Sequence, residues 1–253
     1  MPKKSIIRTE KLCKSFSTGG VQRHIIKNLD TEIYEGDFTV IMGSSGAGKS
    51  TLLYALSGMD KASMGQVYFS DRNITNFNSD QLAIFRRKHC GFVFQQVYLM
   101  ETMSVMDNVL TAGLLTGQNK KQLAAKAKEL FKKVGIGPDL WRKFPNQLSG
   151  GEAQRVGIVR AVINSPDMVF ADEPTGSLNS SSSDAVLNIL TEINQNGQSI
   201  LMVTHDMKSA RRGNRIIYFK DGTICGECDL GPYKTGDKER HDKLRSFLTE
   251  MGW

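Results

Sequence analysis

The stretch GSSGAGKST, Gly43 to Thr51, decides the fold. Its first eight residues fit the spacing G-x-x-x-x-G-K-[ST], and the stretch lies between an apolar run, FTVIM, and a run with helical character, TLLYALSG. A glycine-rich loop between a strand and a helix can turn its backbone N–H groups toward a phosphate chain, and the helix adds the positive end of its dipole. The sequence therefore predicts an α/β protein that binds a nucleoside triphosphate.

The loop residues have distinct expected tasks. Lys49 would neutralise the β- and γ-phosphates, and the Ser50 hydroxyl would ligate Mg²⁺. Guanine specificity is unsupported, because NKKQ, Asn119 to Gln122, lacks the aspartate of an N-K-x-D motif. The loop residues expected to bind the nucleotide are Gly43, Ser44, Ser45, Gly46, Ala47, Gly48, Lys49, Ser50 and Thr51.

Two carboxylates end another apolar run, DMVFADEP, Asp167 to Pro174. At the end of a strand beside the loop, Asp172 would hold Mg²⁺ through its water shell, and Glu173 would act as general base on the attacking water. The alternative is that the two carboxylates cap the next helix. Their pairing with the phosphate-binding loop favours the metal and catalytic roles.

Two further stretches point to phosphate chemistry. SILMVTHD, Ser199 to Asp206, predicts a strand that delivers His205 to the same sheet edge, within reach of the γ-phosphate or the attacking water. NQLSGGEAQRVGIVRAVINSP contains Ser149, Gly150 and Gly151 before a helix with an apolar face. These three residues are either an N-cap with flexible glycines or a second phosphate-binding surface.

Taken together, these motifs resemble the nucleotide-binding subunits of ABC transporters. GSSGAGKS is similar to the Walker A motif, LSGGE to the signature, MVFADE to Walker B, and VTHD carries the switch histidine. The resemblance implies an ABC ATPase: a P-loop NTPase, RecA-like α/β core with an antiparallel β-subdomain and an inserted α-helical subdomain. It also implies one nucleotide-binding domain over residues 1–253, with the helical subdomain at roughly 96–160 and a polar, helical tail at roughly 231–253.

The same resemblance assigns further roles, with ATP and Mg²⁺ as cofactors. Two copies would stack head to tail as a homodimer, so that Ser149, Gly150 and Gly151 of one copy face the ATP of the other. Phe16 would stack on adenine, although a phenylalanine there also suits a core. Gln95 would touch Mg²⁺ and the attacking water.

Two positions depart from the family pattern. Asn179 stands where an aspartate is usual, which removes one charge from the dimer seam and puts in question how the two sites communicate. Glu152 replaces the commoner glutamine after the signature glycines. ATP binding is expected in spite of both.

Details between the loop and the signature resemble the group that serves lipoprotein release, macrolide export and antimicrobial-peptide export or resistance. The resemblance implies an integral membrane permease with an extracytoplasmic domain, whose coupling helix would contact VYLMETMSVM, Val97 to Met106. A sensor kinase is a further partner that it allows. The alternatives are a non-transporting signalling ATPase that controls cell-wall hydrolases and, with less support, a soluble ABC ATPase.

Composition agrees with one folded unit: 253 residues, 40 % hydrophobic and 23 % charged. No apolar run approaches the roughly 18 residues of a membrane span, so we expect a cytosolic protein. The resemblance implies that its permease holds it peripherally on the cytoplasmic face of the membrane. The formal charge of +7 includes lysine-rich stretches that suit a solvated helix face or anionic headgroups, and no nucleic-acid partner is expected. Four scattered cysteines, two in CGEC, predict inert thiols rather than disulfides.

Overall fold

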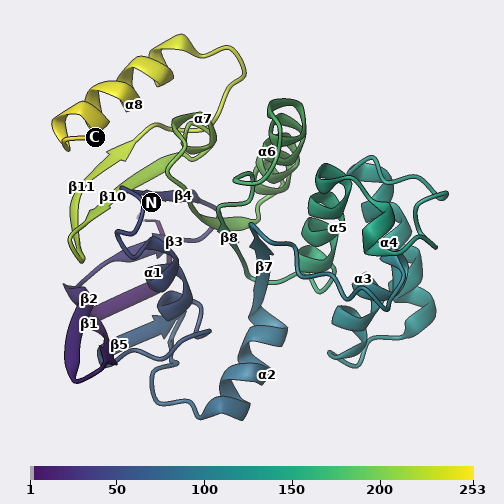
Figure 1. The fold of residues 1–253 in the computed structure, drawn as a ribbon, viewed down its shortest axis with the longest axis horizontal. Helices are drawn as coiled ribbons and strands as arrows, with labels where there is room; N and C mark the ends of the chain where they lie inside the picture. The colour runs from purple at the N-terminus through teal and green to yellow at the C-terminus, as the bar shows by residue number, and fades with distance from the viewer. Residues whose placement is uncertain (1–2) are drawn as a thin grey trace.

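The computed structural model describes residues 3–253, which fold around two β-sheets (Figure 1). The larger sheet has the strand order β11-β10-β4-β9-β8-β7. Strands β10, β4, β9, β8 and β7 are parallel, and β11 pairs antiparallel with β10 at the edge. The strands are β4 (Phe38–Met42), β7 (Cys90–Phe94), β8 (Met168–Asp172), β9 (Ser199–Val203), β10 (Arg215–Lys220) and β11 (Thr223–Asp229).

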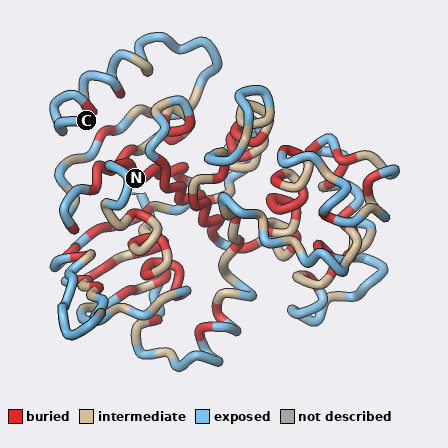
Figure 2. The backbone as a smooth tube through the Cα atoms, viewed as in Figure 1, coloured by how far each residue is buried: buried red, intermediate tan, exposed pale blue. Residues whose placement is uncertain are grey.

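The centre of this sheet is fully buried. Every residue of β4, β8 and β9 is buried, which explains why these strands are continuous apolar runs in the sequence. Successive side chains point to opposite faces: Ile200 and Met202 pack on one side, Leu201 and Val203 on the other. Figure 2 shows this buried stretch through the middle of the molecule. The three strands therefore form a rigid base for the loops that follow their carboxyl ends.

The smaller sheet is antiparallel and comes from the N-terminal part of the chain, as expected. Its order is β2-β1-β5-β6, and β3 pairs separately with β1. It shares one core with helix α1 and one face of the large sheet. The elements are β1 (Ser5–Thr18), β2 (Val21–Leu29), β3 (Glu32–Tyr34), β5 (Met64–Phe69), β6 (Arg72–Asn73) and α1 (Lys49–Leu56).

The remaining helices build two further cores. Helices α6 and α8 cover the other face of the large sheet, whereas α3, α4 and α5 share a separate core and stand to one side in Figure 1. A 3-10 turn, η1, leads into α5, and α2 precedes β7. Their bounds are α2 (Ser79–His89), α3 (Val105–Leu114), α4 (Lys120–Lys133), η1 (Pro145–Gln147), α5 (Gly150–Val162), α6 (Ser180–Gln195), α7 (Met207–Ala210) and α8 (Lys238–Glu250).

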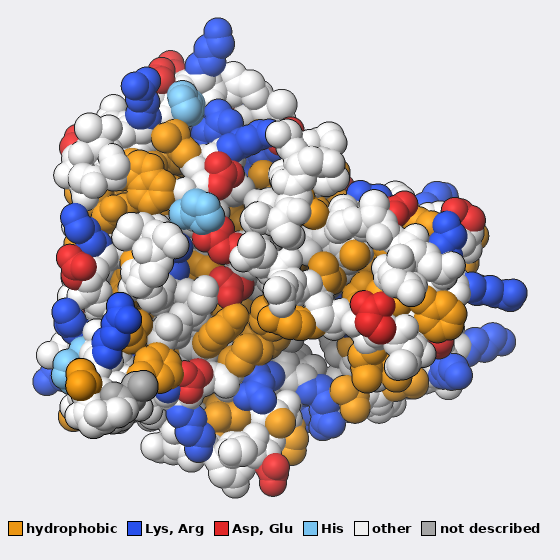
Figure 3. All heavy atoms as spheres, viewed as in Figure 1, with side chains coloured by type: hydrophobic (Ala, Val, Ile, Leu, Met, Phe, Trp, Pro, Cys, Tyr) orange, Lys and Arg blue, Asp and Glu red, His pale blue; other side chains and the backbone are white. Residues whose placement is uncertain are grey.

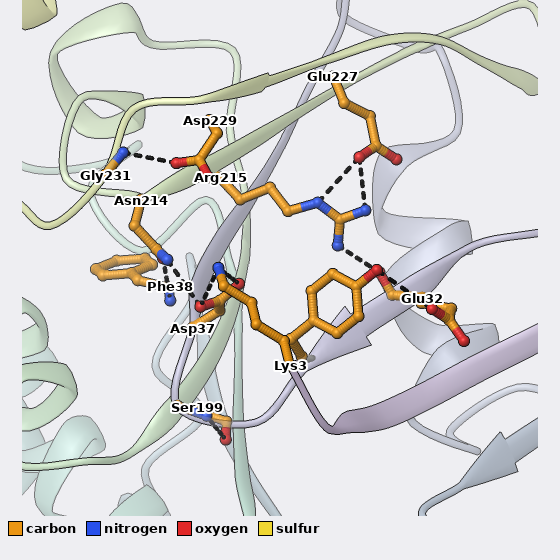
Figure 4. Close-up of polar contacts among 12 residues, drawn as sticks. Lys3, Glu32, Asp37, Phe38, Ser199, Asn214, Arg215, Glu227, Asp229 and Gly231 are labelled. Carbon is orange, nitrogen blue, oxygen red and sulfur yellow. Dashed lines mark hydrogen bonds and ion pairs between the residues drawn. The ribbon is translucent and has the colours of Figure 1, made fainter. Parts of the chain in front are cut away.

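A polar cluster at the amino end of β4 joins the two sheets (Figure 4). The Asp37 carboxylate pairs with the Lys3 ammonium at 2.9 Å and accepts a hydrogen bond from the Asn214 amide at 2.8 Å. Arg215 donates to the Glu227 carboxylate on β11 and to the Glu32 carbonyl on β3. The cluster thus fixes the first described residues and β3 against β10, at the end of β4 opposite Gly43.

The C-terminal tail packs on the protein's own core rather than standing free. Leu244 and Leu248 of α8 are buried with the side chains of β10 and α6, and Trp253 lies edge-on to Tyr218 at 6.3 Å between ring centroids. β10 and β11 pair as a hairpin with Asp221 and Gly222 at its turn. Within residues 3–253, no helix combines the length and the apolar character that a membrane crossing requires.

One buried arginine fastens this tail. Arg240 is 4 % exposed, and burial lowers the pKa of its guanidinium. Its nitrogens donate to main-chain carbonyls that come from the loop after α7 and from the segment before α8, so one side chain of α8 holds these two pieces of backbone. These carbonyls belong to Arg211, Gly213, Leu230, Gly231 and Pro232.

We predict that Arg240→Ala loosens α8. The substitution leaves buried carbonyls without donors, and we expect the free energy of unfolding to fall by about 2–4 kcal/mol. Urea unfolding and hydrogen exchange of the α8 amides measure this. Arg245→Ala, on the exposed side of the same helix, is the matched control and should change the free energy of unfolding by less than about 0.5 kcal/mol. Equal unfolding midpoints for the two variants would contradict the assignment.

Candidate functional site

The sequence motifs meet at one edge of the large sheet. β4, β8 and β9 are parallel and adjacent, so the segments after their carboxyl ends lie together, which is where open α/β sheets bind ligands. A cavity of about 440 Å³ opens there. Its lining residues are Phe16, Arg23, Ile25, Ser45, Gly46, Gly48, Lys49, Ser50, Thr51, Gln95, Glu173 and His205.

Two positions in the loop between β4 and α1 require glycine. A Cβ on Gly43 would lie 2.1 Å from the Phe219 carbonyl oxygen. Gly48 has φ of +96°, and a Cβ there would lie 2.4 Å from the Ile25 side chain. In the described structure no side chain caps the N-terminus of α1. Its first N–H groups are therefore available to an anion in the loop.

The side chain of Lys49, the first residue of α1, is held in this loop by main-chain carbonyls. Its ammonium donates to the carbonyls of Gly43 at 2.8 Å and Ser44 at 2.9 Å, and burial lowers its pKa. Carbonyl dipoles are a weak substitute for a full negative charge. The Lys49 ammonium can thus exchange these carbonyls for phosphate oxygens.

Asp172, at the end of β8, is tied to α1 by two hydrogen bonds. Ser50 Oγ donates to Asp172 Oδ1 at 2.7 Å, and the Tyr54 hydroxyl donates to Oδ2 at 2.6 Å. Burial and the hydrogen bond to Asp172 raise the pKa of Tyr54, so the phenol stays a donor. We did not anticipate Tyr54 from the sequence. Its spacing of four from Ser50 places both on one face of α1 and was the available signal.

Ser50 and Asp172 fit Mg²⁺. Both offer oxygen, the ligand that this hard cation prefers, and Mg²⁺ usually takes only one or two carboxylates besides phosphates and water. Among residues 3–253 no group of three or more His, Cys, Asp and Glu side chains forms a complete metal site, which agrees with such a sparse set. Bound there, the ion would offset the negative charge of the phosphates.

Glu173 and His205 lie side by side at the ends of β8 and β9. His205 Nδ1 is 2.8 Å from Glu173 Oε1, and Thr204 Oγ1 donates to Oε2 at 3.1 Å. Glu173 has a left-handed backbone, φ 45°, which its N–H donation to the Val203 carbonyl at 3.0 Å holds in place. Strained non-glycine residues are frequent at functional sites. Thr204 was not expected here, although its position beside His205 in VTHD was a signal.

Phe16 and Gln95 close the sides of the cavity. The Phe16 ring is 45 % exposed, which rules out the core role, and the Lys14 ammonium lies 4.9 Å from its centroid. Gln95 follows β7 directly. Arg23 and Ile25 are lining residues that no motif indicated; Arg23 arrives through its antiparallel pairing with Phe16.

The three signature residues do not line this cavity. Ser149 is the N-cap of α5: its hydroxyl accepts from the Glu152 N–H, and the Glu152 carboxylate accepts from the Ser149 N–H at 2.8 Å. These hydrogen bonds hold the pKa of the Glu152 carboxyl below its usual range. Glu152 thus completes a capping box. Within one copy, the N-cap interpretation describes these residues, and a phosphate role needs a second molecule.

Asn179 has a similar local task. Its side-chain oxygen caps α6 by accepting from the Ser182 N–H at 2.9 Å and from Ser181 Oγ at 3.0 Å. An aspartate could cap the helix in the same way. The departure therefore removes a charge and leaves the cap intact.

Curated relatives agree with this geometry. The chain is 41 % identical, over 87 % of its length and 97 % of the relative, to an uncharacterized ABC transporter ATP-binding protein of Methanocaldococcus jannaschii. It is 37 % identical to the lipoprotein-releasing system ATP-binding protein LolD of Idiomarina loihiensis, over 87 % of this chain and 96 % of LolD. The macrolide export ATP-binding/permease protein MacB of Aggregatibacter actinomycetemcomitans is 38 % identical over 92 % of this chain, which spans 36 % of MacB.

A solved structure of the same kind superposes closely. The ATP-binding cassette MJ0796, a dimer in a post-hydrolysis state bound to ADP and Pi, has a TM-score of 0.83 and 34 % identity, over 90 % of this chain and all of that one. The family model described as ABC transporter matches residues 26–176. With the loop, the carboxylates and the cavity in place, the chain belongs to the ABC transporter family as an ATP-binding, ATP-hydrolysing subunit.

Proposed function

We propose that this protein powers a membrane permease by hydrolysing ATP as a homodimer, and that its cargo class is an antimicrobial peptide, with lipoprotein and macrolide export as the neighbouring alternatives. The observation that carries the catalytic part is the contact between Glu173 and His205, which line one cavity with Lys49 and Ser50. Thr204 holds the second oxygen of the Glu173 carboxylate. The unit is a single nucleotide-binding domain over residues 1–253, with residues 96–160 as its helical subdomain.

The proposal divides the tasks among the residues in and beside the cavity. Adenine stacks on Phe16, Lys49 and the loop N–H groups hold the phosphates, and Ser50, Asp172 and Gln95 hold Mg²⁺. The Glu173 carboxylate takes a proton from the attacking water as its oxygen approaches the γ-phosphorus. His205 and Thr204 keep that carboxylate in place through its two oxygens.

The homodimer would supply the signature residues that the nucleotide cavity of a single copy lacks. Ser149, Gly150 and Gly151 lie outside the cavity of their own chain, and the N-terminus of α5 is suited to an anion. A two-fold pair would bring this terminus to the γ-phosphate of the partner's ATP. The dimeric MJ0796 cassette supports this arrangement.

The permease contact is proposed at the segment after Gln95. Tyr98 is 65 % exposed and Met100 52 % exposed, so two large side chains of this segment are available to a partner. The macrolide export ATP-binding/permease relative and the lipoprotein-releasing relative support a permease partner. The extracytoplasmic domain of that permease and the peripheral position on the cytoplasmic face are proposed from the sequence resemblance. The antimicrobial-peptide cargo rests on sequence resemblance alone. A sensor kinase has no support from the relatives and is left out of the proposal.

Glu173→Gln tests the general base. The amide cannot accept the proton from water, and we expect ATP turnover to fall by about 10²-fold or more while ATP binding persists. Steady-state phosphate release and equilibrium binding of ATP measure the two properties. Glu129→Gln, an exposed change on α4, is the control and should keep the parent rate. Turnover at the parent rate in Glu173→Gln would refute the assignment.

Lys49→Ala tests the phosphate contact. Loss of a charge-assisted hydrogen bond worth about 1.5–3 kcal/mol predicts ATP affinity weaker by roughly 10- to 100-fold. Calorimetric titration with ATP and Mg²⁺ gives the affinity directly. Lys120→Ala, at the exposed start of α4, should bind ATP as the parent does. Undiminished affinity in Lys49→Ala would show that the ammonium does not reach the phosphates.

Co-purification tests the transport proposal. From membranes dissolved in mild detergent, the tagged protein should bring down a permease with an extracytoplasmic domain. Tyr98→Asp should lose this partner while keeping basal ATP turnover, because the substitution places a charge in the proposed contact. Stimulation of turnover by a peptide, but not by a macrolide, would identify the cargo class. Recovery without any membrane partner would contradict transport.

A further inference from the structure

A second cavity lies away from the nucleotide site. It has a volume of about 490 Å³ and lies between α7 and the segment that leads into α8. Six of its eleven lining residues are Lys or Arg, and two are Asp. Figure 3 shows Lys and Arg side chains at the top of the molecule, where Figure 1 places α7 and α8. Gathering like charges costs free energy of folding, unless an anion offsets them.

Three carboxylates, the lining Asp237 and Asp242 and the Asp184 that pairs with Lys208, stand against six positive charges. Among the described residues, the one ion pair of a lining cation joins Lys208 to Asp184 at 2.8 Å. The lining Asp237 is already the N-cap of α8, where it accepts from the Arg240 N–H at 3.0 Å. The remaining cations of the lining are Arg211, Arg212, Lys234, Lys238 and Arg240, and in the part of the chain that the structure describes none forms an ion pair.

Two arginines of the cavity lining are already held in place before any ligand binds. The Arg212 guanidinium lies 4.6 Å from the Tyr233 ring centroid and donates to Asn188 Oδ1 at 2.8 Å, so it pays little entropy on binding a ligand. The Arg240 guanidinium lies over the same ring at 5.5 Å. His241 also lines the cavity, and its buried Nδ1 has no hydrogen-bond partner among residues 3–253.

Size and charge select the ligand. The volume falls within the range of small-molecule sites. One carboxylate would neutralise a single cation here, whereas a phosphate brings nearly two charges and three acceptor oxygens, which guanidinium and ammonium groups bind well. We propose that this cavity is a binding site for a phosphate-bearing anion, separate from the ATP site. A soluble phosphate compound and a phospholipid headgroup share this chemistry.

Calorimetric titration with inorganic pyrophosphate tests the proposal. All proteins carry Lys49→Ala, so that the nucleotide loop contributes a weak and equal background. Replacing Arg211, Lys234 and Lys238 by Gln removes three lining charges, and we expect pyrophosphate binding to weaken by at least about tenfold, from lost charge-assisted hydrogen bonds. The matched control replaces Lys120, Lys121 and Lys132, exposed on or beside α4, by Gln and should bind pyrophosphate within about twofold of the background protein.

The site would be overturned if the Lys49→Ala protein showed no saturable pyrophosphate binding, or if the cavity and α4 variants lost binding equally. If the triple variant unfolds, as circular dichroism would show, the single exposed change Lys234→Glu replaces it and should still weaken pyrophosphate binding.

Sedimentation with vesicles separates the two sources. Binding to phosphatidylglycerol but not phosphatidylcholine vesicles, lost in the cavity variant and displaced by pyrophosphate, identifies a lipid headgroup. Pyrophosphate binding without vesicle binding identifies a soluble phosphate compound. Either outcome supports the site. Vesicle and pyrophosphate binding that only the α4 variant loses would place the anion on α4 and overturn it.

Discussion

The parallel register of β4, β9 and β8 is the constraint on which the rest of the structure depends. Val203 is level with Ile41 on one side and with Asp172 on the other, so three chain segments far apart in sequence leave the sheet at the same height. The ladder continues past the strands, because Thr204 N–H donates to the Ile41 carbonyl and Glu173 N–H to the Val203 carbonyl. A slip of one residue would turn every side chain to the opposite face. The burial of all three strands on both faces makes such a slip costly.

Much of this could be predicted because the decisive signals are local in sequence. The loop from Gly43 to Thr51, the carboxylates after β8 and the histidine after β9 each follow an apolar run, and a parallel sheet must bring such ends together. Tyr54 could have been predicted in the same way, because helical spacing places it beside Ser50. Arg23 could not, because it reaches the cavity through its register opposite Phe16 in the β1–β2 hairpin, and none of the motifs gives that register.

The cationic cavity between α7 and α8 could not be predicted from the sequence, because it forms only when separate segments meet. Its lysines and arginines come from two segments more than twenty residues apart, and the tail reads as an ordinary solvated helix. The docking of Arg240 on main-chain carbonyls and the contact of Arg212 with Tyr233 bring those segments together. The formal charge of +7 gave the amount of positive charge but not its place. Helix α4 is also rich in lysine. Its lysines lie mainly on the face opposite buried Leu123 and Ala127, as the helical spacing of these two residues predicts.

The contacts of α5 show how the proposed permease contact can influence the catalytic site. Arg160 donates to the carbonyls of Val97 and Tyr98 at 2.5 and 2.6 Å, and Gln154 donates to the Phe94 carbonyl at 2.9 Å. The segment that carries Gln95 is therefore bound on both sides to the helix that begins at the signature. Because packed elements shift as units rather than deform, a permease that displaces exposed Tyr98 would move Gln95 and the N-terminus of α5 together. In the proposed homodimer that terminus faces the partner's ATP, so one contact on this segment would act on both nucleotide sites.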